Sequence, residues 1–229
     1  VIPEFQNPTG ITWPLERRKQ FMEIINQYDF PVLEDDPYGE LRYDGEKVPS
    51  LKSMDTKGNI VFLGSFSKIF MPGLRIAWMV AKPEIVDKIV KLKQAVDLQS
   101  SSFAQRQTSY YIDMYDLDKH VEKIKALYKK RRDLMCQTMK EEFPKEITFT
   151  YPEGGLFTWV TLPEGMDAKE IMPKVLAKDV AYVPGGPFYP NGGNANHFRL
   201  NYSNMPEERI VEGIKRLADV LKEEMASLK

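Results

Sequence analysis

One lysine of the sequence stands where an amine can do chemistry. Lys68 ends the segment Gly64–Lys68, which directly follows the apolar run Ile60–Leu63. A short apolar run bounded by a turn predicts a buried strand, and ligands of open α/β sheets bind beyond the carboxyl ends of the strands. A lysine held there, partly away from water, can act as an amine nucleophile toward a carbonyl group. Considered alone, Lys68 is better explained as an ordinary surface lysine.

A pair of aspartates follows another apolar run in the same way. Phe30–Leu33 leads into Glu34, Asp35, Asp36 and Pro37. Because neighbouring residues of a strand point to opposite faces, we expect only one of the two aspartates to enter a site, while the other turns away or caps the next segment. A buried carboxylate needs a partner, so Asp35 either pairs with a ligand cation or binds backbone donors in a turn.

Two arginines lie among apolar residues. Arg75 stands at the start of the apolar run Leu74–Ala81, which contains no acidic residue. Its rigid fork of donors suits a phosphate group, and Ser65 could add a hydroxyl donor. Arg199 lies in Phe198–Tyr202, where bidentate binding of a carboxylate is its natural use and a buried salt bridge is the alternative.

The elements that must position these residues can be read from the hydrophobic pattern. In the first half, the three apolar runs predict strands of an α/β sheet covered by helices. The turn formers Asn7–Gly10 precede a predicted helix that Thr12 caps, with Pro14 in its first turn. The spacing predicts that one face of this helix is buried, and that face carries Phe21, Ile24, Ile25 and Tyr28.

The second half has a different pattern. A helical stretch from Pro83 to about Ile112 is interrupted near Leu98–Phe103, and one long helix is predicted over Asp118–Glu142. The remainder predicts a compact α+β domain whose last helix buries Ile210, Ile214, Leu217 and Leu221. Its predicted strands are Ile147–Tyr151, Leu156–Leu162, Val180–Val183 and Phe198–Tyr202, and Asp167 with Glu170 begins the helix between them.

Composition excludes several classes of protein. The 229 residues contain 32 Lys and Arg against 33 Asp and Glu, and the net charge of −1 argues against a nucleic-acid or membrane surface bound through bulk charge. One cysteine, Cys136, cannot form an internal disulfide, and His120 and His197 show no zinc-ligand spacing. No apolar run approaches the length of a membrane span. We therefore expect a cytoplasmic globular protein without a metal site.

Five blocks of sequence, taken together, resemble the pyridoxal-phosphate-dependent class I/II aminotransferases of fold type I. The resemblance is nearest to the 2-aminoadipate and broad-specificity subgroup, and it extends from Val1 to Lys229. The blocks are Gln6–Gly10 (QNPTG), Glu34–Leu41 (EDDPYGEL), Gly64–Lys68 (GSFSK), Pro72–Arg75 (PGLR) and Phe198–Ser203 (FRLNYS).

The resemblance implies an α/β fold, with a partial, mostly parallel sheet of the fold type I cofactor domain and a carboxyl-terminal α+β small domain. Residues 1–115 would be the carboxyl-terminal part of the large cofactor-binding domain. Residues 116–229 would be the small domain, including the long linking helix. Family members carry further segments ahead of the first block, so the sequence resembles the carboxyl-terminal part of such an enzyme.

The cofactor implied by the resemblance is pyridoxal 5′-phosphate. Lys68 would hold it covalently and move a proton at the substrate α-carbon. Asp35 would pair with the pyridine nitrogen and keep it protonated. Asn7 and Tyr38 would donate hydrogen bonds to the phenolic oxygen. Lys68, Asp35 and Tyr38 are thus the predicted catalytic residues.

The remaining roles concern the phosphate and the substrate. Ser65 and Arg75 would bind the cofactor phosphate, and Arg199, beside Asn7, would bind the α-carboxylate of the substrate through two parallel hydrogen bonds. The implied partners are an amino acid, a 2-oxo acid and a second copy of the chain in a homodimer. No nucleic acid is expected to bind this segment.

Three functions remain open. The first is transfer of an amino group between an amino acid and a 2-oxo acid. The second is the aminotransferase-like sensing domain of a GntR-type transcription regulator, which Asn7 and the dipeptide Pro37-Tyr38 disfavour. The third is a pyridoxal-phosphate β-lyase. The residues do not identify the amino acid that is the substrate.

Overall fold

The structure is a computed structural model that describes residues 1–227. The chain forms two compact units. Unit 1 comprises Val1–Glu4 and Thr12–Lys125, and unit 2 comprises Phe5–Ile11 and the residues from Ala126 onward. The chain therefore passes between the units near residues 4, 11 and 125. The division predicted between residues 115 and 116 concerns the domains of the family and stays a prediction.

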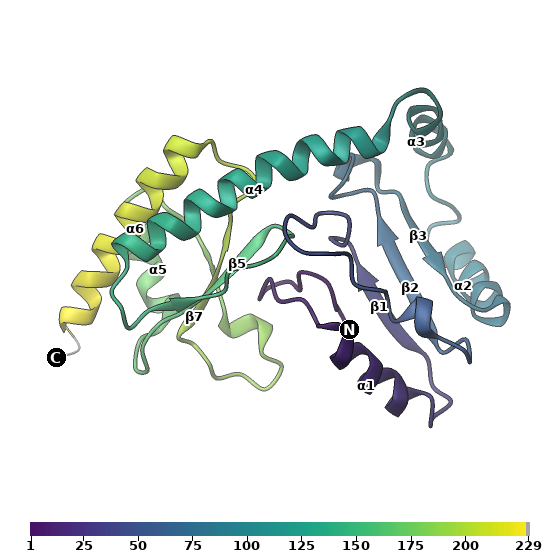
Figure 1. The fold of residues 1–229 in the computed structure, drawn as a ribbon, viewed down its shortest axis with the longest axis horizontal. Helices are drawn as coiled ribbons and strands as arrows, with labels where there is room; N and C mark the ends of the chain where they lie inside the picture. The colour runs from purple at the N-terminus through teal and green to yellow at the C-terminus, as the bar shows by residue number, and fades with distance from the viewer. Residues whose placement is uncertain (228–229) are drawn as a thin grey trace. The chain divides into compact units, whose positions relative to one another are not determined.

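Unit 1 is built on a three-stranded sheet. Its strands are β1 (Val32–Asp36), β2 (Ile60–Ser65) and β3 (Ala77–Val80), in the order β1-β2-β3 (Figure 1). β1 and β2 are parallel, as expected for strands joined by a long crossover. β3 follows β2 after a short connection and is antiparallel to it. The sheet is thus a mixed one.

Helix α1 (Leu15–Ile25) packs beside β1 and β2, but it differs in detail from the prediction. Pro14 occupies the N-cap position, and no side chain caps the helix, so Thr12 does not have the expected role. The buried face consists of Arg18, Met22 and Ile25, whereas Ile24 and Tyr28 are more than half exposed. The predicted stripe is confirmed at Ile25 and at Phe21, which is partly buried against the core, and it is wrong at Ile24 and Tyr28.

The inward position of Arg18 has a clear electrostatic reason. Its guanidinium is 1% exposed and pairs with Glu4 at 2.6 Å, and the second carboxylate oxygen of Glu4 pairs with Arg42 at 2.9 Å. Burying a charge is costly unless it is paired. The two arginines on one carboxylate meet that requirement and rotate α1 so that Met22 and Ile25 complete the core with Val32 of β1.

The remaining helices of unit 1 follow the expected pattern. α2 (Pro83–Val96) and α3 (Ser102–Met114) are separated by a break, where Leu98 has a left-handed backbone. Ser101 caps α3 by accepting a hydrogen bond from the amide of Ala104. Two short 3-10 turns, η1 (Lys52–Met54) and η2 (Pro72–Leu74), complete the unit. α4 (Leu117–Glu142) begins in unit 1 and continues into unit 2.

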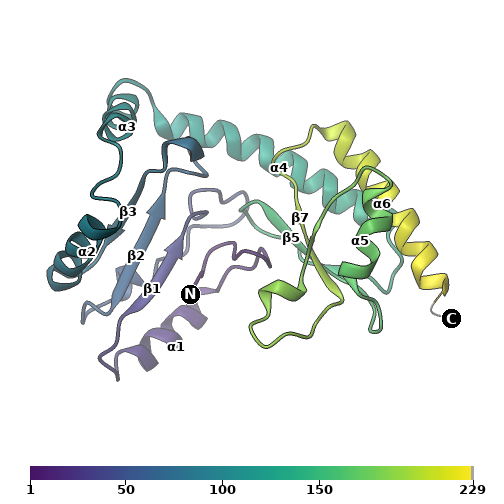
Figure 2. The same ribbon diagram turned by 180° about the vertical axis from the view of Figure 1, so that it is seen from behind.

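Unit 2 contains a four-stranded antiparallel sheet in the order β4-β5-β7-β6, and Figure 2 labels its two central strands, β5 and β7. Its long central strands are β5 (Phe157–Thr161) and β7 (His197–Asn201), and its short outer strands are β4 (Thr148–Phe149) and β6 (Val183–Pro184). The strand expected over Val180–Val183 pairs only from Val183 onward. Pro184 has no amide hydrogen, which limits pairing to a short edge.

The helices of unit 2 confirm two sequence predictions. Asp167 caps α5 (Ala168–Leu176) by accepting hydrogen bonds from the amides of Lys169 and Glu170. α6 (Glu207–Ser227) lies beside α5 in both ribbon views. It buries the four expected residues Ile210, Ile214, Leu217 and Leu221. A 3-10 turn, η3 (Gly186–Phe188), lies between β6 and β7.

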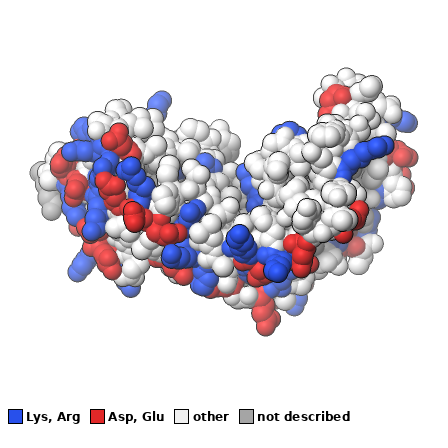
Figure 3. Space-filling view, turned by 90° about the horizontal axis from the view of Figure 1, so that it is seen from above, with Lys and Arg blue, Asp and Glu red and all other residues white. Residues whose placement is uncertain are grey.

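Three observations concern the surface charge, the helices and the possible metal ligands. On the face drawn in Figure 3, Lys and Arg side chains lie among Asp and Glu side chains and form no large field of one sign. None of the helices within residues 1–227 is both long and apolar enough to cross a membrane. In the same range, no cluster of three or more His, Cys, Asp or Glu side chains could hold a metal ion.

Candidate functional site

Asp35 lies at the carboxyl end of β1 on the open face of the sheet. Exposure alternates along the strand, with Val32 and Glu34 buried and Leu33 and Asp35 exposed. The Asp35 amide donates to the carbonyl of Val1, so the first residues run along the edge of β1. Partial burial raises the pKa of the Asp35 carboxyl, and the nearby N-terminal ammonium group of Val1 partly offsets this. Within residues 1–227 the carboxylate makes no hydrogen bond or ion pair.

Asp36 points to the other face and caps the following turn, which is the second of the two roles expected for this pair. Its Oδ1 accepts a hydrogen bond of 2.7 Å from the amide of Gly39. Burial raises the pKa of Asp36 to about 6, and the bond from Gly39 lowers it by less. A Cβ atom at Gly39 would collide with the Asp36 carboxylate. A side chain at position 39 would therefore displace the carboxylate that caps the turn carrying Tyr38.

Glu34 binds β1 to the connection between β1 and β2. Its side chain is buried, and its two oxygens accept hydrogen bonds of 2.8 Å from the amides of Leu51 and Lys52. Burial raises the pKa of Glu34, while these two bonds lower it. The carboxylate thus fixes the connection between β1 and β2 to the sheet and holds the end of β1 in place.

Lys68 lies in the turn that follows β2. Asp35 and Leu63 are register partners in the parallel pair, so Ser65 and the Lys68 turn follow from the same end of the sheet as Asp35. The turn is held by the bond from the Phe70 amide to the Phe66 carbonyl and by the buried side chain of Ile69. Lys68 is half-buried as a residue, and within residues 1–227 its ammonium group has no hydrogen bond or ion pair.

Ser65, Tyr38 and Arg75 complete the predicted residues of unit 1. The Ser65 hydroxyl accepts a bond of 3.1 Å from the Ser67 amide, and Tyr38 is 5% exposed. Arg75 does not open the strand, because β3 begins two residues later, at Ala77. Its backbone is left-handed with φ of 56°, and its exposed guanidinium donates to the carbonyl of Pro72 at 3.2 Å. No acidic side chain within residues 1–227 pairs with it.

Unit 2 brings together the other two predicted residues, Asn7 and Arg199. Nη1 of Arg199 donates a hydrogen bond of 2.6 Å to Oδ1 of Asn7. The guanidinium carbon lies 4.1 Å from the ring centroid of Phe157 and 5.6 Å from that of Phe188. Such cation–π contacts orient the plane of a guanidinium group.

An aromatic cluster beside Arg199 was not predicted from the sequence. Trp159 is the register partner of Arg199, and it stacks on His197 with centroids 5.6 Å apart. Phe188 meets Trp159 edge-on at 5.9 Å, and Tyr189 lies 5.8 Å from His197. The alternation of Phe157 and Trp159 along one strand was the available signal, but the Phe188 turn joins the cluster only through the fold.

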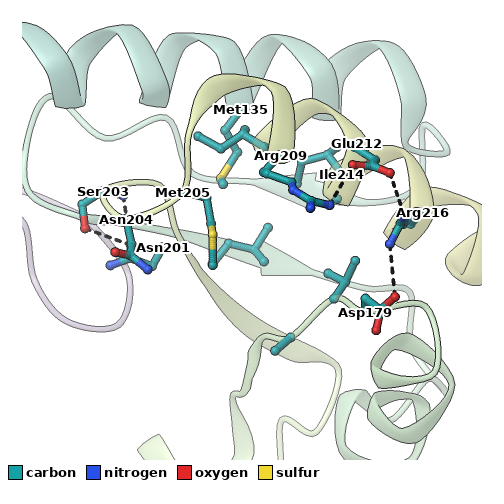
Figure 4. A pocket seen from close by; sticks show the side chains of 15 residues that line it. Met135, Asp179, Asn201, Ser203, Asn204, Met205, Arg209, Glu212, Ile214 and Arg216 are labelled. Atoms are coloured by element: carbon teal, nitrogen blue, oxygen red, sulfur yellow. Dashed lines mark hydrogen bonds and ion pairs between the residues drawn. The ribbon is translucent and has the colours of Figure 1, made fainter.

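A separate cavity in unit 2 contains none of the predicted site residues. It has a volume of about 750 Å³ and lies between α6 and the residues that flank β6 and β7. Its charged side chains bind one another: Glu212 pairs with Arg209 and Arg216, and Arg216 also pairs with Asp179 (Figure 4). It presents no lysine and no unpaired carboxylate within the described chain, so its chemistry does not match that of Lys68 and Asp35.

Comparisons with known proteins agree with the resemblance. Residues 1–217 match the family model for aminotransferase class I and II. The chain is 49% identical over 225 residues to aromatic-amino-acid aminotransferase 1 of Thermococcus litoralis, covering 98% of this chain and 54% of that protein. It is 38% identical to 2-aminoadipate transaminase of Thermus thermophilus, covering 97% and 56% of the two chains.

Solved structures show the same relationship. The multiple substrate aminotransferase of Thermococcus profundus superposes with a TM-score of 0.94 at 46% identity, covering 98% of this chain and 56% of that one. Similarity at 30% identity also reaches an uncharacterised HTH-type transcriptional regulator of Bacillus subtilis, of which the chain covers 46%. The chain thus spans about half the length of the curated relatives it matches.

The family model covers nearly the whole chain, and the structural match extends through both units. The five sequence blocks lie in these two units. Asp35 lies at the carboxyl end of β1, and Lys68 lies in the turn after the parallel strand β2. Asn7 and Arg199 are joined by a hydrogen bond. On this evidence the chain belongs to the class I and II aminotransferases.

Proposed function

We propose that the protein transfers an amino group between an amino acid and a 2-oxo acid, using pyridoxal 5′-phosphate. The observation that carries this proposal is the arrangement of Lys68 and Asp35. The carboxylate lies at the carboxyl end of β1 and the amine lies in the turn after the adjacent parallel strand β2, and neither makes a hydrogen bond or an ion pair within residues 1–227. Ligands of α/β sheets bind at this edge.

The residues of unit 1 fit the cofactor through the chemistry of their side chains. Lys68 would hold the aldehyde group covalently, and Asp35 would pair with the protonated ring nitrogen. A carboxylate that faces the open side of the sheet and forms no ion pair within residues 1–227 suits this partner. Ser65 and Arg75 would bind the phosphate, and the absence of an acidic partner for Arg75 within the described residues supports that role. When bound, the cofactor supplies an electron sink for the substrate α-carbon.

Tyr38 and Lys68 act on protons in this proposal. Tyr38 would donate a hydrogen bond to the phenolic oxygen of the cofactor, together with Asn7. The Lys68 amine would be released when the substrate amine binds. It would then take the proton from the substrate α-carbon and deliver it to the cofactor. One amine that both holds and releases a proton accounts for transfer in either direction.

Asn7 and Arg199 would bind the substrate. The Arg199 fork has five donors, of which one bonds to Asn7, and a carboxylate can accept two parallel bonds from the same group. Fixing the α-carboxylate determines which bond at the α-carbon breaks. The relatives named above make aromatic amino acids and 2-aminoadipate the first substrates to assay. A homodimer and a cytoplasmic location remain predictions.

The experiment is a half-reaction with the protein in its full natural length, loaded with pyridoxal phosphate. We expect the visible absorbance of the lysine-bound cofactor to disappear on addition of a substrate amino acid and to return on addition of a 2-oxo acid. Lys68→Ala should lose the visible band and the reaction, whereas Lys88→Ala, an exposed lysine of α2, should keep both. A wild-type protein that shows no such band would overturn the proposal.

The same preparation separates the two alternatives. A β-lyase would release pyruvate from a sulfur amino acid without a need for a 2-oxo acid, so pyruvate release in place of amino-group transfer would favour the lyase. A sensing domain would bind the cofactor and respond to no amino acid. Similarity to an HTH-type regulator keeps this second outcome in the test. Amino-group transfer with an aromatic amino acid, 2-aminoadipate or any other amino acid assayed would exclude the sensing domain.

A further inference from the structure

Arg132 is a fully buried arginine that none of the five sequence blocks contains. It lies on α4 and is 0% exposed. Its Nε donates a 2.7 Å hydrogen bond to Oδ1 of Asp133, and its Nη1 donates to the carbonyl oxygen of Pro152. Its guanidinium carbon also lies 4.6 Å from the ring centroid of Tyr151. Burying a cation costs free energy unless it is paired. We therefore asked what the contacts of Arg132 with Tyr151 and Pro152 stabilise.

The Tyr151 ring is fixed by the same group of side chains. Its hydroxyl donates a 2.8 Å hydrogen bond to Oδ1 of Asp133, the oxygen that Arg132 also binds. These bonds lower the pKa of Asp133 against the opposing effect of burial. Arg132 and Asp133 therefore hold Tyr151 through its ring and its hydroxyl group, and Arg132 holds Pro152 through its carbonyl group.

The clamped segment continues into the residues that support the Asn7 loop. Gly10 packs so closely that a Cβ atom there would lie 3.1 Å from Cβ of Pro152 and 2.5 Å from the carbonyl oxygen of Phe157. The hydroxyl of Thr150 donates 2.9 Å to the carbonyl of Thr9. Residues 150–157 are thus the surface on which the Asn7 loop rests.

The same segment also supports the strand that carries Arg199. The Tyr202 hydroxyl donates 2.8 Å to the carbonyl of Gly154, and the Tyr202 amide donates to the carbonyl of Leu156. Tyr202 is fully buried and lies three residues beyond Arg199. Asn7 and Arg199, which are joined by a hydrogen bond, therefore both lie on segments that residues 150–157 hold in place.

We propose that Arg132 is a positioning residue that sets the geometry of the Asn7–Arg199 pair, and through it the affinity for the substrate carboxylate. This inference rests on the proposed function. Arg132 touches neither member of the pair and acts by fixing Pro152 and Tyr151. Only an arginine has donors in a planar fork that can bond a carbonyl and a carboxylate at once, while its face lies on a ring. A lysine keeps the charge and loses that geometry.

The test compares Arg132→Lys with Tyr151→Leu in the full-length protein loaded with pyridoxal phosphate. Tyr151 is 58% exposed, so its variant removes the ring under the guanidinium without opening the core. We expect both variants to raise the KM for the amino acid by roughly 10-fold, because a displacement well below 1 Å weakens a bidentate contact strongly. The kcat and the absorbance of the bound cofactor should change by less than about threefold, because Lys68 and Asp35 are untouched.

Two controls separate positioning from general destabilisation. Leu217→Ala empties a fully buried position of α6 in the same unit and should lower the melting temperature without raising KM. Arg216→Lys makes the same chemical change at an arginine that bonds Glu212 and should leave KM unchanged. If Arg132→Lys and Tyr151→Leu keep the wild-type KM, or if Leu217→Ala raises it equally, the inference is wrong. A wild type without activity would instead overturn the proposed function.

Discussion

Nη1 of Arg199 and Oδ1 of Asn7 lie 2.6 Å apart, although 192 residues separate them in the chain. The bond joins the turn Asn7–Gly10 to strand β7 within unit 2. It fixes one side of the guanidinium fork, while the rings of Phe157 and Phe188 lie against its face. The fork is therefore oriented by the protein before any carboxylate arrives, which reduces the ordering required when a substrate binds.

Replacing Arg199 by lysine tests this orientation. Arg199→Lys keeps the positive charge but cannot donate two parallel hydrogen bonds to a carboxylate. We expect kcat/KM for an amino acid to fall by roughly 10- to 100-fold, the loss of one charge-assisted hydrogen bond or two. Steady-state kinetics of the full-length protein measures this. Arg209→Lys, an exposed arginine of α6, is the control, and equal losses in both variants would contradict a specific role for Arg199.

Asp35 and Asp36 provide a matched pair on opposite faces of one strand. Asp35→Asn removes the negative charge that faces the open side of the sheet, and we expect kcat to fall by roughly 10²- to 10³-fold because the cofactor nitrogen loses its partner. Asp36→Asn should keep kcat within about threefold of the wild type, since the asparagine oxygen can still accept from the Gly39 amide. A larger loss of activity for Asp36→Asn than for Asp35→Asn would reverse the assignment of the two faces.

Much of the framework could be predicted from the sequence, because it depends on local pattern. The apolar run before Lys68 corresponds to β2, and the alternation rule placed Asp35 and Asp36 on opposite faces. The run Phe30–Leu33 shares only Val32 and Leu33 with β1, which continues through the acidic residues to Asp36, and Phe30 and Leu33 are exposed rather than buried. The stripe of α6 is buried as the period of 3.6 requires. These features need only a short window of sequence to specify them.

Other features depend on partners distant in sequence, and periodicity carries no information about them. Arg18 is buried because Glu4 accepts its charge, and this ion pair rotates α1 away from the predicted face. Arg132 lies on a long helix rich in charged residues, and its burial follows from its contacts with Pro152 and Tyr151. In both cases a charged side chain is buried because a specific partner distant in sequence is buried beside it.

The pKa of Asp36 makes stability depend on pH in a definite direction. The carboxyl has a pKa of about 6 in the folded chain against an ordinary value of 3.8. Between these values the folded state binds more protons than the unfolded state, so the free energy of unfolding falls as pH rises. The contribution of protonated Asp36 is fully present below about pH 4 and is lost as the pH passes 6, an effect of at most roughly 3 kcal/mol.

Asp36→Asn isolates this contribution from the other titrating groups. The difference in unfolding free energy between the variant and the wild type, from urea denaturation at several pH values, should shift in favour of the variant as pH rises from about 4 to 7. A difference that stays constant over this range would show that Asp36 titrates normally. Asp35→Asn serves as a second reference on the same strand.

Gly10 is the position where the Asn7 loop has the least freedom. Its φ of +69° is in the left-handed region, and a Cβ atom would lie 2.5 Å from the carbonyl oxygen of Phe157. Gly192 has nearly the same φ, +70°, but nothing lies within 4 Å of a Cβ built there. The two glycines share the backbone cost of a side chain, and only Gly10 has the steric clash.

Comparing the two alanine variants therefore separates these effects. We expect Gly192→Ala to lower the free energy of unfolding by about 1 kcal/mol, the cost of a left-handed alanine. Gly10→Ala should lower it by about 2–4 kcal/mol, because the Phe157 carbonyl or the loop must move. Since that movement displaces Asn7 from Arg199, Gly10→Ala should also raise the KM for the amino acid. Equal losses of stability and an unchanged KM would show that the loop accommodates a side chain without moving Asn7.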